Sequence, residues 1–299
     1  MLILLALVPI LSAQQPAAMA GSETPSAQAI MARVAANQDA SESARTHYLY
    51  IQHADVISRK GKTVRCEEKT ESRVVPTASG FSQELLKLEG RLLVKHAYIT
   101  YTDLAKRKGK DDDETITVNM DGDNSAMDRE LVESMREDLT KSHTKDGIAA
   151  GLFPLTSKSQ AAYAFDLLGQ EKLNGRDVYH LTFAPKDKSD YDWKGDAYID
   201  TTAYEPVVVR TTMSRKIPFA VRAMLGTNLP GLGFTVIYAP EPGGVWFPVS
   251  FGTEFKIKVL FFFHREIILS ASNRDFQQTH VTSTILPAKP GAVDTIPKF

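Results

Sequence analysis

The segment Trp246–Val259 constrains the fold more than any other stretch, because apolar and polar residues alternate along it. One alternate set is apolar except for Thr253, and the other is polar or glycine. The first set is Phe247, Val249, Phe251, Thr253, Phe255, Ile257 and Val259, and the second is Ser250, Gly252, Glu254, Lys256 and Lys258. Successive side chains of a strand point to opposite faces, so the pattern predicts a long, half-buried β-strand. Such a strand belongs in a broad antiparallel sheet with one covered face.

Further segments rich in β-branched and aromatic residues predict other strands, separated by short turns. The predicted strands are residues 47–58, 63–75, 81–88, 91–101, 161–171, 175–185, 195–200, 206–214, 231–238, 265–275 and 279–285, with a turn at Glu89-Gly90. These spacings are typical of an antiparallel meander. No regular strand–helix–strand alternation appears, which argues against a doubly wound fold.

Two helices are predicted beside these strands. Thr24 and Pro25 favour a helix start, and Ile30 and Val34 lie four residues apart on one stripe. Residues 127–142 have an apolar stripe as well, with charged residues on the remaining surface. The stripe is Leu131, Met135 and Leu139, and the other side is Glu130, Glu133, Arg136, Glu137 and Lys141. Residues 216–228 are interpreted as either a third helix or a loop.

The N-terminal residues are predicted to be an export signal rather than part of the fold. Residues 2–11 form a short apolar run, and Ala18-Met19-Ala20 gives a small-residue cleavage site before Gly21. The alternative is a buried N-terminal helix. We therefore expect a signal peptide at residues 1–20, one domain at residues 21–289, and a loose tail at residues 290–299. No later run is apolar over about 18 residues, so no transmembrane helix is predicted.

Composition excludes several classes of function. The net charge is −1, so no global basic field recruits nucleic acid. Cys66 is the only cysteine, which rules out an intramolecular disulfide and a cysteine-rich metal site. It is interpreted as a half-buried bystander within a strand, with a reactive or intermolecular thiol as the alternative.

Catalytic and metal-binding motifs are not found. There is no G-x-S-x-G, no H-E-x-x-H, no P-loop, and no G-x-G-x-x-G opening a helix. The segment Asp121-Gly122-Asp123 begins like a calcium loop, but Ala126 and Val132 stand where that loop needs Gly and Glu. The acidic pair Asp190 and Asp192 lies in a polar connection with nothing to bury it. The expected protein is not an enzyme and needs no cofactor or metal.

The predicted strands carry many apolar side chains, and only two or three predicted helices are available to cover them. Tyr179, Leu181 and Phe183 share one strand face, and Val207 and Val209 share another. Core packing alone explains these residues, and an apolar cavity for a lipid-like ligand is the alternative. In the second case, the residues predicted to contact the ligand are Tyr179, Leu181, Phe183, Phe247, Val249, Phe251 and Phe255.

Several strand segments resemble the outer-membrane lipoprotein-sorting protein family, which includes the periplasmic lipoprotein carrier. They are Asn174-Gly175-Arg176-Asp177-Val178-Tyr179-His180-Leu181, Pro185-Lys186, Ala197-Tyr198-Ile199-Asp200-Thr201-Thr202, Glu205-Pro206-Val207 and Trp246-Phe247-Pro248. The resemblance covers about residues 25–285. It implies an α+β fold in which a curved antiparallel sheet, an unclosed half-barrel, has two or three helices covering its concave face and an apolar cavity.

The resemblance also implies a function without catalysis. Members of the family bind acyl chains or the lipid of a lipoprotein, so the expected partner is a lipid or a lipidated protein in the periplasm of a Gram-negative-type envelope. An envelope-stress regulatory sensor on the same fold is the first alternative. A hydrolase with an unrecognised site is the second.

Four consecutive large apolar residues interrupt the alternation after Trp246–Val259. Leu260, Phe261, Phe262 and Phe263 lie where a hairpin must turn, between Lys258 and His264. Four apolar side chains at a turn cannot all face inward, so at least two are predicted to be exposed. They are expected to contact a membrane or a membrane protein, and the alternative is that a helix or the tail covers them.

Overall fold

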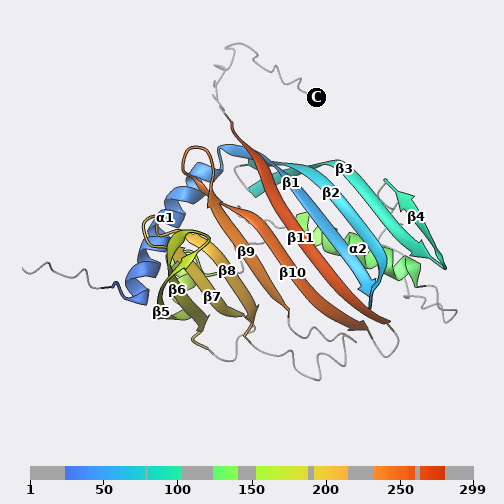
Figure 1. The fold of residues 1–299 in the computed structure, drawn as a ribbon. Helices are drawn as coiled ribbons and strands as arrows, with labels where there is room; N and C mark the ends of the chain where they lie inside the picture. Colours follow the sequence, from blue (N-terminus) through green and yellow to red (C-terminus); the bar gives the residue numbers. More distant parts are fainter. Residues whose placement is uncertain are drawn as a thin grey trace, which may run out of the picture.

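A computed structural model of the chain describes residues 24–77, 80–102, 124–140, 153–187, 192–214, 232–259 and 263–279. Its strands form one antiparallel sheet built from two meanders (Figure 1). The first meander is β1 (Tyr48–Lys60), β2 (Thr63–Thr77), β3 (Gly80–Val94) and β4 (Ala97–Tyr101). The second is β5 (Tyr163–Leu173), β6 (Arg176–Pro185), β7 (Trp193–Asp200), β8 (Pro206–Met213), β9 (Gly233–Pro240), β10 (Trp246–Val259) and β11 (Phe263–Gln278).

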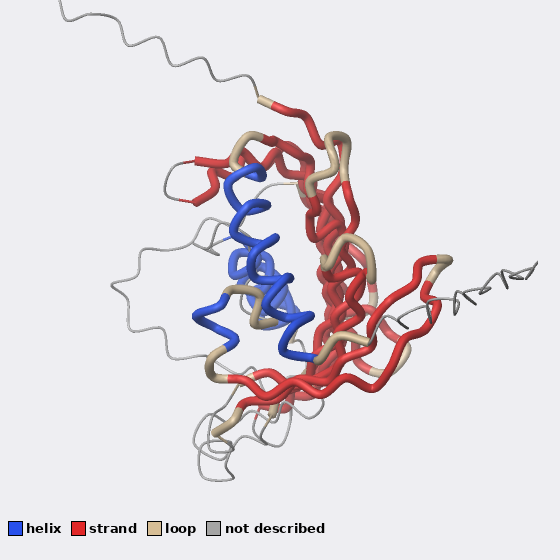
Figure 2. Tube along the Cα trace, turned by 90° about the vertical axis from the view of Figure 1, so that its left-hand side faces the viewer, coloured by secondary structure: helices blue, strands red, loops and turns tan. Residues whose placement is uncertain are grey.

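The pairing of β1 with β11 joins the two meanders. The strand order is β4-β3-β2-β1-β11-β10-β9-β8-β7-β6-β5, so β4 and β5 are the edges of an 11-stranded sheet that does not close. Three helices accompany it, α1 (Ala27–Arg45), α2 (Ser125–Thr140) and the short α3 (Ser157–Gln160). The sheet curves around them, and they lie on its inner face (Figure 2). The predicted α+β fold with an unclosed half-barrel is confirmed.

The first helix begins two residues later than predicted. Its N-cap is Ser26, whose side chain accepts a hydrogen bond from the backbone N–H of Ala29. It continues to Arg45. Contacts with the rest of the chain hold its C-terminal half: Asn37 donates to the backbone oxygen of Ala203, and Arg45 donates to that of Trp246.

One predicted turn is wrong. Glu89-Gly90 lies inside β3, and the chain turns instead at Lys95, which has a φ of 55°. The reason is the packing of Tyr101 from β4. A Cβ on residue 90 would lie 2.2 Å from the Tyr101 ring, so glycine is required here for the close approach of that ring rather than for a turn.

Three of the predicted segments fall in parts of the chain near its two ends that the structure does not describe. The predicted signal peptide at residues 1–20 and the tail at residues 290–299 lie outside the described residues, as does the predicted strand at residues 279–285 beyond its first residue. Within the described part of the chain, no helix is long and apolar enough to cross a membrane.

Candidate functional site

The inner face of the sheet carries two apolar regions, each under one helix. α1 packs with its apolar stripe on the strands at the β5 end of the sheet, whereas α2 lies over β1, β2 and β3 (Figure 1). The first region contains the fully buried side chains of Leu181, Ile199, Val209 and Val236 beside Ile30, Met31 and Val34 of α1. The second contains Val56, Cys66, Leu92 and Leu269 beside Val132 of α2.

A row of three aromatic side chains connects these regions. The rings of Trp193 in β7 and Phe234 in β9 meet edge to face with centroids 5.1 Å apart. Phe234 in turn stacks on Phe251 in β10, again at 5.1 Å and with an interplanar angle of 25°. All three side chains are half-buried, and Phe251 packs against both regions. We call Trp193, Phe234 and Phe251 the aromatic row.

The residues predicted to line a ligand cavity do not all lie together. Tyr179, Leu181 and Phe183 are buried side by side under α1. Phe255 is buried in a separate group, against Leu131 and Met135 of α2.

The other members of the predicted set lie on β10. Phe251 belongs to the aromatic row. Phe247 instead packs on Tyr48 and Phe276, with centroids 5.3 and 4.5 Å away. The half-buried Val249 lies at a register shift between β10 and β9, which interrupts the ladder between Pro248 and Ser250. A parity argument assumes an uninterrupted ladder, and it therefore could not show that Phe247 and Phe251 belong to different clusters.

Trp193 and Phe234 were missed as candidates. Phe234 lies in the predicted strand at residues 231–238, but only one other aromatic residue there, Tyr238, hinted at a cluster. Trp193 is the first residue of β7 and lies two residues before the predicted strand at residues 195–200. Neither side chain could be placed beside Phe251 without the order β7-β8-β9-β10 of the sheet.

Of the four residues in the predicted membrane contact, Phe263 is the one that the structure describes. Phe263 begins β11, is 2% exposed, and lies under the guanidinium group of Arg265. Leu260, Phe261 and Phe262 lie outside the described residues, so their predicted exposure stays a prediction.

A buried ionic network holds α2 against the sheet. The Asp128 carboxylate is 0% exposed and receives two hydrogen bonds from Arg265 of β11, from Nε to Oδ1 and from Nη2 to Oδ2, the second at 2.7 Å. Ser58 Oγ of β1 donates to the same carboxylate at 3.0 Å, and Arg65 Nε of β2 lies 3.4 Å away. One carboxylate of α2 thus contacts three strands.

A second group of polar residues lies further along α2. Arg136 Nε donates to Glu68 Oε2 of β2 at 2.7 Å, and Tyr101 donates its hydroxyl proton to Glu68 Oε1 at 2.8 Å. The Tyr101 hydroxyl also lies 3.4 Å from Cys66 Sγ. Burial raises the pKa of Cys66 to about 12, so the thiol is protonated at neutral pH. The sequence pattern had placed Glu133 and Arg136 on the solvent side of this helix, and the structure buries both.

The buried charged groups between α2 and the sheet pair with one another. Each carboxylate of the α2 network already accepts hydrogen bonds from guanidinium or hydroxyl groups. Among the described residues, no group of three His, Cys, Asp or Glu side chains is placed to hold a metal ion. His180 does contact Asp196, with Nε2 2.9 Å from Oδ1. However, it alternates with Tyr179 and Leu181 along β6, so it faces away from the aromatic row.

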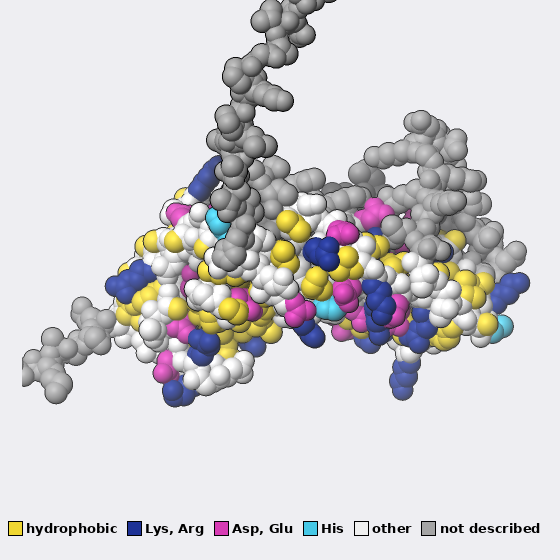
Figure 3. Space-filling view, turned by 90° about the horizontal axis from the view of Figure 1, so that it is seen from above, with side chains coloured by type: hydrophobic (Ala, Val, Ile, Leu, Met, Phe, Trp, Pro, Cys, Tyr) yellow, Lys and Arg dark blue, Asp and Glu magenta, His cyan; other side chains and the backbone are white. Residues whose placement is uncertain are grey.

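The described side chains on the face seen from above do not carry charge of one sign only (Figure 3). Seen from above, charged side chains of both signs and apolar side chains are interspersed over the described surface (Figure 3). This agrees with the net charge of −1. The aromatic row on the inner face is, among the described residues, the feature that best suits an apolar ligand.

No family model matches this chain, and no curated protein matches it. Solved structures with a similar fold include an outer membrane lipoprotein-sorting protein domain from Vibrio parahaemolyticus, at 14% identity and a TM-score of 0.35, covering 84% of this chain and 94% of that one. A LolA superfamily protein from Nitrosomonas europaea has 10% identity and a TM-score of 0.35, with 86% and 96% covered. A DUF1329 family protein from Desulfovibrio piger has 11% identity and a TM-score of 0.36, with 85% and 94% covered.

Lipoprotein-sorting proteins, the class that the sequence resembles, are thus among the structures similar to this chain. All three TM-scores are below 0.5, so the likeness extends no further than the fold.

Proposed function

We propose that this protein binds and carries a lipid or the lipid part of a lipidated protein, without catalysis, in the periplasm. The acyl chains lie along the aromatic row between α1 and α2. The observation that carries this proposal is the row itself: Trp193, Phe234 and Phe251 are three adjacent, half-buried aromatic rings on the inner face of an open sheet. Rings in that position offer an acyl chain an apolar surface.

The energy available from such a surface is sufficient for carriage. Burying a methylene group contributes about 0.8 kcal/mol, so ten methylenes of one chain contribute roughly 8 kcal/mol before the cost of association. A ligand bound in this way is held firmly but not permanently. Release then requires a helix to move away from the aromatic row, and α2 is the element whose polar attachments suit a reversible movement.

The experiment that tests this proposal begins with the full chain purified from a Gram-negative periplasm. An organic extract of the protein is examined by mass spectrometry, and binding of a fluorescent acyl probe is then titrated. Phe234→Ala removes the central ring of the row. We expect this change to weaken probe binding by about tenfold, because a lost aromatic contact is worth roughly 1.5 kcal/mol.

Tyr98→Ala is the matched control, since Tyr98 is an aromatic residue of β4 that is 46% exposed and distant in sheet order from the row. It should leave probe binding within about twofold. The proposal fails if the extract contains no lipid and Phe234→Ala binds the probe as the parent does. Co-purification of a protein partner without lipid would instead favour an envelope-stress sensor, and release of hydrolysed lipid would favour an enzyme.

A further inference from the structure

One part of β3 has a strand partner on one side only. β2 pairs with β3 from Gly80 to Leu92, but β4 pairs only with residues 90–94. Within the described part of the chain, the backbone of residues 81–89 therefore has no strand beside it on the side away from β2. Figure 1 shows β4 as a short strand along one end of β3. We call residues 81–89 the free edge.

Two exposed apolar side chains lie on this edge, Leu85 and Leu86, each 39% exposed. Tyr98 and Ile99 of β4, 46% and 48% exposed, lie further along the sheet, where β4 pairs with Leu93 and Leu92. Sheet edges of soluble proteins are usually short, charged or covered, because an exposed apolar edge is a template for another strand. The free edge is long and also carries Glu84, which pairs with Arg73, and Lys87 and Glu89, which pair with each other. With these charges paired, its exposed leucines are the kind of surface that partner chains use.

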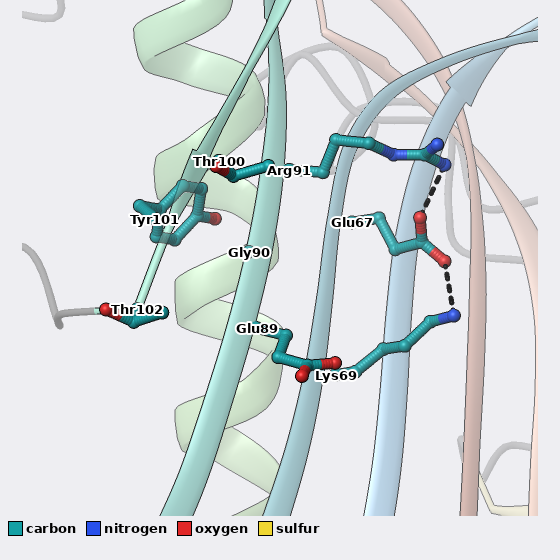
Figure 4. Close-up of a pocket in the computed structure, with 8 residues that line it drawn as sticks. All are labelled: Glu67, Lys69, Glu89, Gly90, Arg91, Thr100, Tyr101 and Thr102. Carbon is teal, nitrogen blue, oxygen red and sulfur yellow. Dashed lines mark hydrogen bonds and ion pairs between the residues drawn. The ribbon is translucent and has the colours of Figure 1, made fainter.

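A charged recess lies at the end of the free edge, where β4 stops. It has a volume of about 420 Å³ and is lined by residues of β2, β3 and β4 (Figure 4). Glu67 lies between Arg91 Nη2, 2.5 Å from Oε2, and Lys69 Nζ, 3.3 Å from Oε1. Glu89, the last residue of the free edge, lines the recess too. The charged ends of Arg91, Glu67 and Lys69 point away from β4 in Figure 4, so Glu89 is the charged group of the recess that lies on the free edge itself.

We propose that the free edge of β3 accepts an extended segment of another polypeptide as an added strand. The segment lies antiparallel to β3 and follows in line after β4. Its apolar side chains recur at alternate positions, on the face where Leu85 lies, and a polar or charged side chain enters the recess beside Glu89. This site is separate from the aromatic row, so the inference does not depend on the proposed lipid carriage.

The size of the edge favours a flexible segment over a second copy of this chain. At about 3.4 Å per residue the free edge is roughly 30 Å long, and a strip about 10 Å wide along it covers about 300 Å². A stable interface between two folded proteins buries about 800 Å² on each partner. A segment that becomes ordered on binding needs less, since backbone hydrogen bonds provide affinity and alternate side chains provide specificity.

The test uses a synthetic peptide of alternating valine and threonine that ends in a lysine, with a version carrying proline at its central valines as a negative probe. Binding is titrated to the full chain, and amide hydrogen exchange is followed at residues 81–89. We expect the first peptide alone to slow exchange there. Leu85→Lys should weaken its binding by at least about tenfold, because a charge on an edge strand opposes pairing.

Leu168→Lys is the matched control, because Leu168 is 61% exposed on β5, the opposite edge of the sheet. It should leave peptide binding within about twofold. The inference is overturned if the peptide leaves exchange at residues 81–89 unchanged, or if both leucine variants weaken binding equally. It is also overturned if those amides are already protected in the free chain, or if sedimentation shows a dimer that Leu85→Lys abolishes.

Discussion

α1 and α2 cover the same face of one sheet, but they are held by opposite kinds of contact. The buried surface of α1 is mainly apolar, with Ile30, Met31, Val34 and Ala35 each no more than 1% exposed. Polar contacts occur mainly towards its C-terminal end. Among the side chains of α2 that the structure describes, at residues 125–137, Val132 is the one large apolar side chain that is completely buried. The other buried residues of that range are Asp128, Glu133 and Arg136.

The two kinds of contact contribute differently to the free energy that holds each helix on the sheet. Burial of an apolar side chain contributes about 1.5–3 kcal/mol with little dependence on orientation. A buried ion pair must first lose its hydration, so the pair adds little net stability, yet breaking it leaves an unpaired charge at high cost. α1 is therefore bound strongly and α2 is bound specifically. We expect α2 to be the helix that leaves the sheet at lower free energy and returns to one position.

The largest expected effect comes from removing the charge of Asp128. Asp128→Asn leaves Arg265 buried at 4% exposure without its carboxylate partner. We expect this to lower the free energy of unfolding by about 3–5 kcal/mol, because an unpaired buried charge is costly. Urea denaturation followed by circular dichroism measures the change.

The double variant Asp128→Leu, Arg265→Met separates the ion pair from simple loss of a helix contact. It removes both charges, so we expect it to recover most of the lost stability. If the double variant is as unstable as Asp128→Asn, the cost does not arise from an unpaired guanidinium, and the contrast between the two helices fails.

A smaller effect distinguishes the helices through two matched valines. Val34 of α1 and Val132 of α2 are both 0% exposed, so truncation removes the same buried atoms from each. We expect Val34→Ala to lower the free energy of global unfolding by about 2 kcal/mol. Val132→Ala should lower it by a comparable amount and should in addition speed hydrogen exchange in α2, because that helix opens locally without global unfolding. Equal effects on both measurements would show that the two helices are attached alike.

The sequence predicted the elements whose pattern is local. The strand predicted from the alternation over Trp246–Val259 has the same first and last residues as β10, because one face of that strand is partly or fully exposed to solvent along most of its length. Period-four apolar residues located both helices to within a few residues. The prediction failed at Gly90, where the cause is the Tyr101 ring of a neighbouring strand rather than any local preference of the glycine.

The candidate site depends on contacts that no local pattern contains. Asp128 and Arg265 are 137 residues apart in the chain, and each looks like an ordinary surface residue of an amphipathic element. Their pairing becomes visible only once β1 is known to lie beside β11. The aromatic row could not be predicted for the same reason. Its rings, Trp193, Phe234 and Phe251, come from three strands, and they are brought together by the order of the strands in the sheet.

The smallest expected effect uses Cys66 as a reporter, because its side chain lies under α2 beside Val132 and is 0% exposed. Only the thiolate reacts with iodoacetamide, and its fraction rises tenfold per pH unit below the pKa. Burial raises the pKa of Cys66 to about 12 in the folded chain. Reaction within the folded state would therefore accelerate steadily up to that pH. Reaction only after α2 detaches would level off near about 8.5, the pKa of an ordinary thiol.

We expect the second behaviour between pH 7 and 10, measured as the rate of mass increase. Asp128→Asn should raise the labelling rate at every pH, because it weakens the attachment of α2 over the thiol. Val34→Ala should change it little, because that substitution acts on α1. A rate that keeps rising tenfold per unit through pH 10, or that is the same in Asp128→Asn and the parent, would mean that α2 stays on the sheet while Cys66 reacts.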